Sequence, residues 1–122
     1  MATSTFEAHV RHQPAAAIID LQGEIDGLAE GVLNTAYDEA EQQQPAVILL
    51  NFRAVVYINS TGIALVVGLL KRSRKAGRAL IACSMSDHYR EIFQITRLTD
   101  FMRLFPDEAS ALAGAANNQH TA

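Results

Sequence analysis

Hydrophobic and polar positions change their spacing several times along the chain, and each spacing predicts a different element. Residues 6–12 alternate between apolar and polar side chains, as in a strand with one covered face. After a turn at Pro14, the apolar run at residues 16–21 predicts a second strand that ends at Gln22-Gly23. Because the connection between the two strands is short, we expect them to form a hairpin.

The next segment changes to the spacing of a helix that ends before Pro45. Its expected inward face consists of Leu28, Val32, Leu33, Ala36, Tyr37 and Ala40. Residues 47–50 then form a short, wholly apolar run, which is typical of a central strand shielded by its neighbours. A second helix is predicted from Ile63 to Arg74, directly after Asn59-Ser60.

The remaining elements continue the alternation of strands and helices. We expect a strand at residues 80–83, a helix capped by Ser86, an edge strand at residues 101–105 and a final helix opened by Pro106-Asp107-Glu108; Tyr89, Ile92 and Phe93 should face inward from the helix after Ser86. The order β-β-α-β-α-β-α-β-α predicts an α/β fold. Its mixed sheet should have about five strands, mostly parallel with an antiparallel edge strand, and about four helices. Residues 1–122 should form one domain, with residues 1–5 and 114–122 flexible.

Charge and cysteine content narrow the class of protein. The net charge of −3 gives no broad positive surface, so nucleic acid binding is not expected. A small basic group (Arg72, Arg74, Lys75 and Arg78) fits a solvated helix end that favours the helix dipole; contact with acids of a partner is the weaker alternative. The single cysteine, Cys83, has apolar neighbours and should be buried. With neither a signal segment nor an apolar run long enough to span a membrane, we expect a cytoplasmic protein.

Motifs of catalysis are missing from the sequence. The four histidines (His9, His12, His88 and His120) do not have the spacing of a metal site. No Gly-x-Ser-x-Gly elbow and no glycine-rich phosphate loop is present. We therefore expect no catalytic residue, metal or cofactor, and a binding protein rather than an enzyme. A small hydrolase that uses Ser60 is a weaker alternative.

The most informative stretch is residues 57–63, where a helix start carries an amide, two hydroxyls and a glycine. Asn59 and Ser60 can both cap this helix. A phosphate on Ser60 would meet free backbone N–H groups and a favourable dipole, so the fold would tolerate it. Gly62 would let a partner approach the backbone closely.

The helix that follows has apolar residues on two sides. Ile63, Val66, Val67 and Leu70 share the side that should pack on the sheet. Leu65 and Leu69 project roughly opposite, together with Thr61, Gly68 and Arg72. This outer face predicts a docking surface for a partner. The alternative is that another element of the chain, such as the C-terminal helix, covers Leu65 and Leu69.

Several of these segments together resemble the STAS domain family, and most closely the bacterial anti-sigma factor antagonists. They are Gly23-Glu24-Ile25-Asp26 after a strand, Val47 to Asn51 as a central strand, Ile58 to Ile63, and a basic helix end at Lys71 to Gly77; the resemblance extends from about Phe6 to Leu112. It implies a STAS fold. It also implies binding to an anti-sigma factor that is a serine kinase with a histidine-kinase-like ATP fold.

The resemblance further implies a switch. Phosphorylation of Ser60, with Thr61 as a secondary candidate, would end binding, and a PP2C-type phosphatase would reverse it. The predicted interface consists of Glu24, Asp26, Asn59, Thr61, Gly62, Leu65, Leu69 and Arg72. The family commonly has aspartate at positions 51 and 59, and the asparagines here would remove negative charge beside the switch. The alternative function is a non-switching STAS scaffold subunit of a larger regulatory or transport-associated complex.

Overall fold

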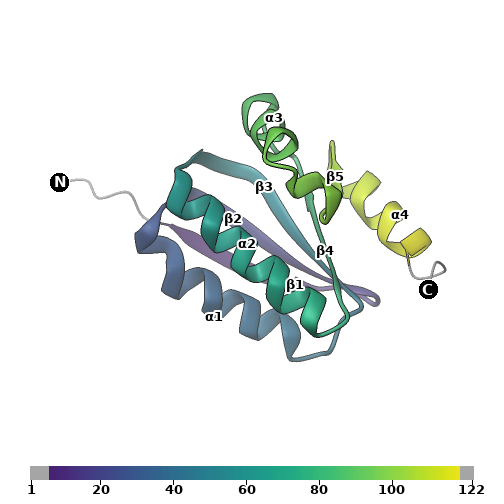
Figure 1. Ribbon diagram of the computed structural model, residues 1–122. Helices are drawn as coiled ribbons and strands as arrows, with labels where there is room; N and C mark the ends of the chain where they lie inside the picture. Colours follow the sequence, from purple (N-terminus) through teal and green to yellow (C-terminus); the bar gives the residue numbers. More distant parts are fainter. Residues whose placement is uncertain (1–5, 119–122) are drawn as a thin grey trace.

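Five strands form one mixed sheet in the computed structural model, which describes residues 6–118. The strands are β1 (Glu7–His12), β2 (Ala16–Ile25), β3 (Val47–Ile58), β4 (Ala79–Cys83) and β5 (Leu104–Phe105), and they lie side by side in chain order (Figure 1). β1 pairs antiparallel with β2, and every other pairing is parallel. The predicted hairpin, mixed sheet and antiparallel edge strand are confirmed.

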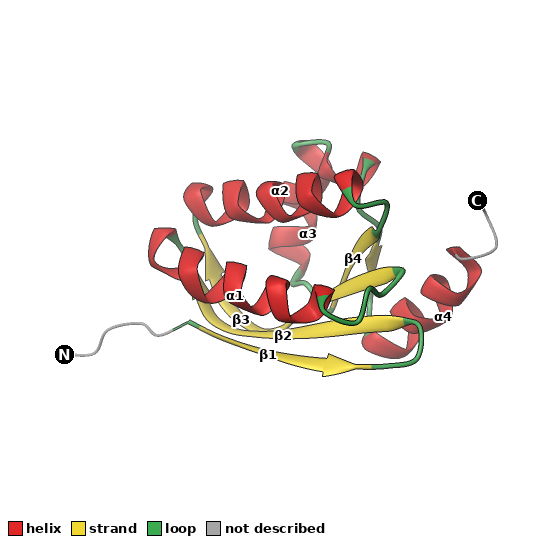
Figure 2. Ribbon diagram, turned by 90° about the horizontal axis from the view of Figure 1, so that it is seen from below, coloured by secondary structure: helices red, strands yellow, loops and turns green. Residues whose placement is uncertain are grey.

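The helices cover both faces of this sheet. They are α1 (Glu30–Glu41), α2 (Ser60–Lys75), α3 (Asp87–Ile95) and α4 (Glu108–Asn118), with short 3-10 helices η1 (Gly27–Ala29) and η2 (Leu98–Asp100). Figure 2 shows α1, α2 and α3 above the sheet and α4 on its other side. The buried residues agree with this division, because alternate positions of the strands belong to two separate apolar clusters. The larger cluster joins the sheet to α1, α2 and α3, and the smaller one contains Ala111 and Ala115 of α4.

β2 and β3 are longer than the sequence predicted. β2 continues past Gln22-Gly23 to Ile25, and β3 continues past Leu50 to Ile58. The pairing of β3 with β4 ends at Asn51 and Cys83, whereas its pairing with β2 continues to Ile58. The last parts of both strands, residues 23–25 and 55–58, therefore form a two-stranded extension of the sheet; we call it, together with residues 52–54 that lead into it, the strand arm. The arm contains a register shift, and Gly23 within it has a φ of 102°, a conformation that favours glycine.

The C-terminal region corrects two predictions. Residues 101–103 are not part of a strand, because β5 consists of Leu104 and Phe105 alone. Residues 114–118 continue α4 rather than forming a loose tail. A Cβ atom on Gly114 would lie 2.5 Å from the Phe105 ring, so α4 approaches β5 closely at this glycine. The other predicted flexible residues, 1–5 and 119–122, lie outside the described part.

A polar network ties the edge of the sheet to α4. Arg11 donates to both carboxylate oxygens of Asp20, at 2.6 and 2.9 Å, and to Glu108 at 2.7 Å. These bonds to Arg11 hold the pKa of Asp20 below its ordinary value. Asn51 completes the network, since its Nδ2 donates to Asp20 at 2.8 Å.

The position of Asn51 overturns its expected role beside the switch. Asn51 points to Asp20 and Cys83, on the α4 side of the sheet. Ile58 lies seven positions further along β3, which corresponds to about 23 Å along a strand. The amide at position 51 therefore serves the edge network and cannot change the charge at the start of α2.

An Asn51→Asp variant is expected to lower the free energy of unfolding by about 1–3 kcal/mol at pH 7, because it replaces a donor to Asp20 by a second carboxylate. The loss should shrink as the pH falls, since one acid of the new pair then binds a proton and can donate again. Urea denaturation at pH 7 and at lower pH measures both effects. Gln43→Glu makes the same chemical change at an exposed loop position and is the control. Equal losses of unfolding free energy in the two variants would contradict the hydrogen bond from Asn51 to Asp20.

Candidate functional site

The ends of β2 and β3 bring two helix starts together. Ile25 pairs with Ile58, so the residues that follow them, Asp26 and Asn59, emerge at the same end of the sheet. The Asp26 side chain accepts a hydrogen bond from the Leu28 amide at 2.9 Å and caps η1. The Asn59 side chain accepts one from the Gly62 amide at 2.8 Å and caps α2. Asn59 is thus the cap, and an asparagine fulfils this role without a charge.

Gly62 allows α2 to start directly against β2. A Cβ atom on this residue would lie 1.9 Å from the Ile25 carbonyl oxygen and 2.9 Å from Cγ2 of Ile58. Gly62 is itself buried. The expectation that Gly62 admits a partner to the backbone is therefore wrong, because the space beside it is filled by the chain's own strand.

Ser60 and Thr61 occupy the first turn of α2 and are both exposed. Within the described residues, the Ser60 hydroxyl makes no hydrogen bond, so the alternative that Ser60 caps the helix is wrong. The first amides of a helix have no partner within it; here the Asn59 side chain accepts from the Gly62 amide and the Asn59 carbonyl oxygen from the Ile63 amide, which leaves the amides of Ser60 and Thr61. The start of α2 therefore presents an accessible hydroxyl beside unpaired N–H groups.

The predicted outer face of α2 is only partly correct. Leu69 is 1% exposed and belongs to the same buried cluster as Leu33 and Tyr37 of α1. Leu65 is half-buried and packs against that cluster. α1, and not the C-terminal helix, is therefore the element that covers this side of α2, and Leu69 cannot contact a partner.

Arg72 also serves the contact between α1 and α2. Its Nη2 donates to Asp38 at 2.7 Å and to Glu41 at 3.1 Å, and its guanidinium lies 4.4 Å from the centre of the Tyr37 ring. It is three turns away from Ser60 along α2. Arg72 therefore holds the two helices together and does not belong to the surface around Ser60.

The exposure of three apolar residues near this end, Leu28, Val32 and Tyr57, was not predicted. Leu28 was expected on the inward face of α1, yet it lies in η1 and is 84% exposed. Val32 is likewise more exposed than expected, at 42%. Tyr57, at the end of β3, is 48% exposed and pairs with Glu24. Only the cap at Asp26, which starts η1 before α1, could have indicated from the sequence that Leu28 lies outside the amphipathic pattern.

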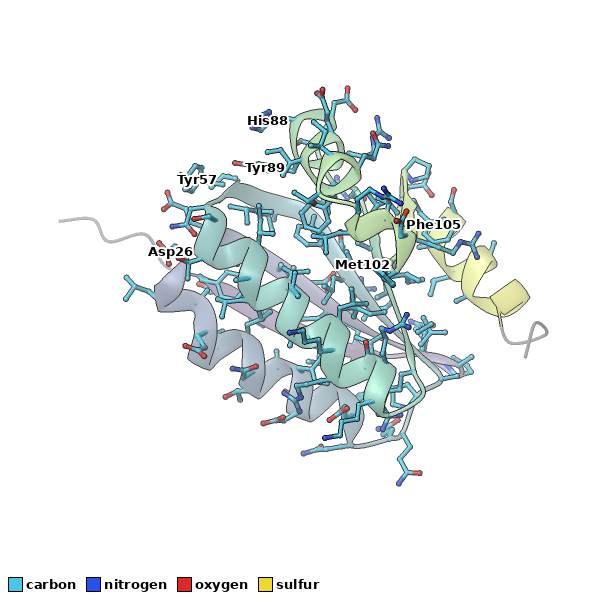
Figure 3. The ribbon with its side chains drawn as sticks, in the orientation of Figure 1. Asp26, Tyr57, His88, Tyr89, Met102 and Phe105 are labelled. Atoms are coloured by element: carbon cyan, nitrogen blue, oxygen red, sulfur yellow. The ribbon has the colours of Figure 1, made fainter. Side chains whose placement is uncertain are left out.

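These residues form one surface, which we call the strand-end surface: Glu24, Asp26, Leu28, Tyr57, Ser60 and Thr61. η1 packs beside the start of α2, and a Cβ atom on Gly27 would lie 3.6 Å from the Thr61 methyl group. Figure 3 shows Asp26 and Tyr57 at the same end of the molecule. The surface combines two carboxylates, two apolar side chains and two hydroxyls, and none of its six residues is basic. Such a composition suits a protein partner with a basic rim and an apolar pocket.

α3 supports the strand-end surface from outside the sheet. The hydroxyl of Tyr89 accepts a hydrogen bond from the Ile58 amide at 3.1 Å, and the same tyrosine packs edge-on against His88. This bond satisfies an amide on the edge of β3 that no strand covers. The predicted inward orientation of Tyr89 and Phe93 is confirmed, with Phe93 fully buried.

Other chemical features of the described residues do not converge on this surface. Residues 6–118 contain no group of three or more His, Cys, Asp or Glu side chains arranged to hold a metal ion. Nor does that part of the chain include a helix long and apolar enough to cross a membrane. Cys83 is fully buried as predicted, and burial raises the pKa of its thiol, which makes it a poor nucleophile.

The family model of the STAS domain matches residues 7–111 of the chain. This match covers most of the sequence, and the chain belongs to the STAS domain family. The resemblance stated from the sequence motifs is confirmed.

Known relatives agree in name and in fold. The anti-sigma-B factor antagonist of Staphylococcus aureus is 30% identical over 86 residues, which cover 70% of this chain and 80% of that protein. An anti-sigma factor antagonist from Mycobacterium paratuberculosis has a structure that matches with a TM-score of 0.77 at 18% identity, over 92% of this chain and 95% of the other. The phosphorylated form of the Bacillus cell fate determinant SpoIIAA matches with a TM-score of 0.67 at 24% identity, over 89% and 97% of the two chains. At these identities the two structures show the fold alone.

Proposed function

We propose that this protein is an anti-sigma factor antagonist that binds an anti-sigma factor with serine kinase activity, and that phosphorylation of Ser60 ends the binding. The observation that carries the proposal is the exposed Ser60 hydroxyl at the start of α2, inside a mixed apolar and acidic surface. The names of the relatives support the same general role. The protein acts in this proposal by binding and not by catalysis.

Ser60 suits a reversible switch because the fold does not use its hydroxyl. A kinase can reach the side chain without unfolding the helix, since Asn59 supplies the cap. A phosphate there adds a charge of about −2, which the free amides and the dipole at the start of α2 stabilise. The domain therefore keeps its structure in both states, and the modification acts on the surface alone.

The surface around Ser60 explains how a phosphate would end binding. Leu28 and Tyr57 offer exposed apolar anchors at the same end of the sheet as the hydroxyls. Glu24 and Asp26 already make this end acidic, so a partner needs basic groups at its rim and an apolar centre. A phosphate at Ser60 would enter that centre as a strongly hydrated dianion, and removing its water would oppose association.

The experiment uses the anti-sigma kinase encoded nearest to this chain's gene, with ATP, and locates incorporated phosphate by mass spectrometry. Phosphate is expected on Ser60. Ser60→Ala should incorporate none and should keep its affinity for the kinase, because only an exposed hydroxyl is lost. Ser60→Asp should weaken binding at least about tenfold, because it places a charge inside the interface. Isothermal titration calorimetry measures both affinities.

Thr61→Val is the matched control, because it removes the neighbouring exposed hydroxyl and should leave phosphate incorporation unchanged. Phosphate that persists in Ser60→Ala and disappears in Thr61→Val would move the switch to Thr61. Binding without any phosphate on either residue would instead support the non-switching scaffold. A PP2C-type phosphatase should remove the phosphate from Ser60 and restore binding.

A further inference from the structure

The outer edge of β1 carries backbone groups that no described strand pairs with. Within residues 6–118, β1 lies at the edge of the sheet and pairs with β2 alone. At the hairpin, Gln13 and Ala16 exchange both backbone hydrogen bonds, at 2.8 and 3.4 Å. Such pairs alternate along an antiparallel ladder, so every second residue back from Gln13 bonds to β2. The N–H and C=O groups of the residues between, Ala8, Val10 and His12, therefore point away from the sheet.

This edge has little of the usual protection against a further strand. No hydrogen bond from another described residue reaches its outward backbone groups, although α1 lies along the same edge (Figure 1). β1 has six residues and no proline. Its apolar side chains Ala8 and Val10 share the face that α1 covers, and the charged ones alternate with them on the opposite face. The edge is therefore open to another extended chain.

A groove of about 480 Å³ runs beside this edge, between β1 and α1. Ala8 lines it from the strand, and Leu28, Val32, Thr35 and Glu39 line it from the helical side. The last four follow helical spacing and are all exposed. From the first to the last they span about 17 Å, the length of about five residues of a strand. We call this space the edge groove.

The edge groove is apolar at one end and acidic at the other. β1 starts beside the end of β2, and α1 follows that same end through η1, so β1 and α1 run in the same direction. Leu28 and Val32, which are 84% and 42% exposed, thus lie toward the start of β1, and Glu39 lies toward His12. None of the residues that line the groove is basic. An occupant with apolar side chains at one end and a positive charge at the other complements it.

A second copy of this chain suits the edge less well than a peptide segment. α1 packs more closely against β1 than against β2. Two copies joined through β1 would therefore place their α1 helices over strands about 4.8 Å apart, whereas packed helices need about 8–10 Å between their axes. A single extended segment brings no helix to this face, so its backbone can reach the edge beside α1.

We propose that β1 takes up an extended segment of a partner protein as a sixth strand, antiparallel to β1. The segment carries a basic residue opposite His12, on the side of Glu39, and β-branched apolar residues opposite Val10 and Ala8. Its backbone supplies the hydrogen bonds that the edge lacks, and its alternate side chains in the edge groove give specificity. This contact is additional to the Ser60 switch proposed above.

Isothermal titration calorimetry of the whole protein with the peptide acetyl-Lys-Thr-Val-Thr-Val-Thr-amide tests the proposal. N-methylation of its first valine removes an N–H group that would bond to Val10, and should weaken binding at least tenfold. N-methylation of its second threonine blocks only an N–H group that faces away from β1, and should leave the affinity within about twofold. Failure of the unmodified peptide to bind, or equal effects of the two methyl groups, would overturn the proposal.

Variants of the protein test the edge groove itself. Val32→Lys places a positive charge in the groove and should weaken the peptide at least tenfold. Val56→Lys makes the same change at an exposed valine of β3 outside the groove, and should leave the affinity unchanged. Glu39→Gln should weaken the peptide about threefold, and should not affect a peptide with glutamine in place of lysine. Equal affinities of Val32→Lys and Val56→Lys for the peptide would contradict binding in the groove.

A two-dimensional NMR titration shows where the peptide binds. Amide shifts should concentrate at Ala8, Val10 and Val32. Shifts concentrated at Ser60 and Thr61 would overturn the proposal. Sedimentation of the free protein as a dimer that the peptide dissociates would overturn it as well, because a second copy would then occupy the edge.

Discussion

Replacing Gly62 by alanine is expected to lower the free energy of unfolding by about 3 kcal/mol, a large part of the total stability of an ordinary domain. The added Cβ atom would lie 1.9 Å from the carbonyl oxygen of Ile25, and backbone of a paired strand cannot move aside as a flexible side chain can. Either α2 must shift away from β2 or the end of the strand arm must open. Both changes would displace Ser60, so binding to the anti-sigma kinase should be lost together with stability.

Gly68→Ala provides a matched control in the same helix. Nothing lies within 4 Å of a Cβ atom at Gly68, so alanine there should stabilise α2 by up to about 1 kcal/mol through its higher helix propensity. The midpoints of urea denaturation of the two variants should therefore shift in opposite directions from that of the original protein. The melting temperatures should show the same contrast, with that of Gly62→Ala about 10 °C below that of the original protein. Similar midpoints for the two variants would mean that α2 does not start against β2 as described.

Replacing Leu28 by aspartate is expected to weaken binding to the anti-sigma kinase by about 30-fold, or about 2 kcal/mol, and to leave stability nearly unchanged. Leu28 is 84% exposed, so its side chain contributes little to the core. If the strand-end surface is the interface, this leucine is its most protruding apolar anchor. Aspartate in its place would bring an unpaired charge into the contact.

Ile95→Asp is the control for the change of an exposed apolar residue into an acid. Ile95 is 71% exposed but lies at the end of α3, away from the strand-end surface. Its replacement should leave the affinity within about twofold, as expected for positions outside an interface. The affinity of Leu28→Ala for the anti-sigma kinase should lie between those of Leu28→Asp and the original protein. If Leu28→Asp binds as tightly as Ile95→Asp, the partner docks elsewhere on the domain.

The elements of the fold were predictable because local signals agree with one another. Caps at Asn59 and Ser86, the proline after α1 and the apolar runs of β3 and β4 define where helices and strands lie. The same signals indicate that Glu24, Asp26 and Ser60 lie at one end of the sheet. Parallel strands end at a common edge, so residues that follow two such strands become neighbours.

The sequence did not predict which sides of α2 are covered. This helix packs on the sheet and also against α1, so its buried positions span two sides of the helical wheel, and Leu69 belongs to the second. A wheel shows where apolar residues gather but not which flank receives a neighbouring helix. The prediction that Leu28 faces inward was wrong for a related reason. Leu28 follows the hydrophobic spacing of α1 but precedes the first turn of that helix.

The extent of β3 was underestimated because of its changing surroundings. Residues 47–50 have neighbours on both sides in the sheet and are wholly apolar, which made them easy to recognise. Beyond Asn51 only β2 pairs with the strand, and exposed residues such as Arg53 and Val56 interrupt the apolar run. A half-covered strand with a register shift has no regular period to detect.

The strand arm gives the protein two levels of mechanical stiffness. Residues 47–51 of β3 are bonded to strands on both sides, whereas residues 52–58 are bonded to one strand and to the hydroxyl of Tyr89 at their far end. Bending the arm breaks fewer bonds than disturbing the centre of the sheet, so it requires less free energy than unfolding. Asp26, Asn59 and the start of α2 directly follow the last residues of the arm. The surface proposed to change partners thus stands on a part of β3 that a strand bonds on one side only, and a contact made with Tyr89 or α3 would act on it without touching Ser60.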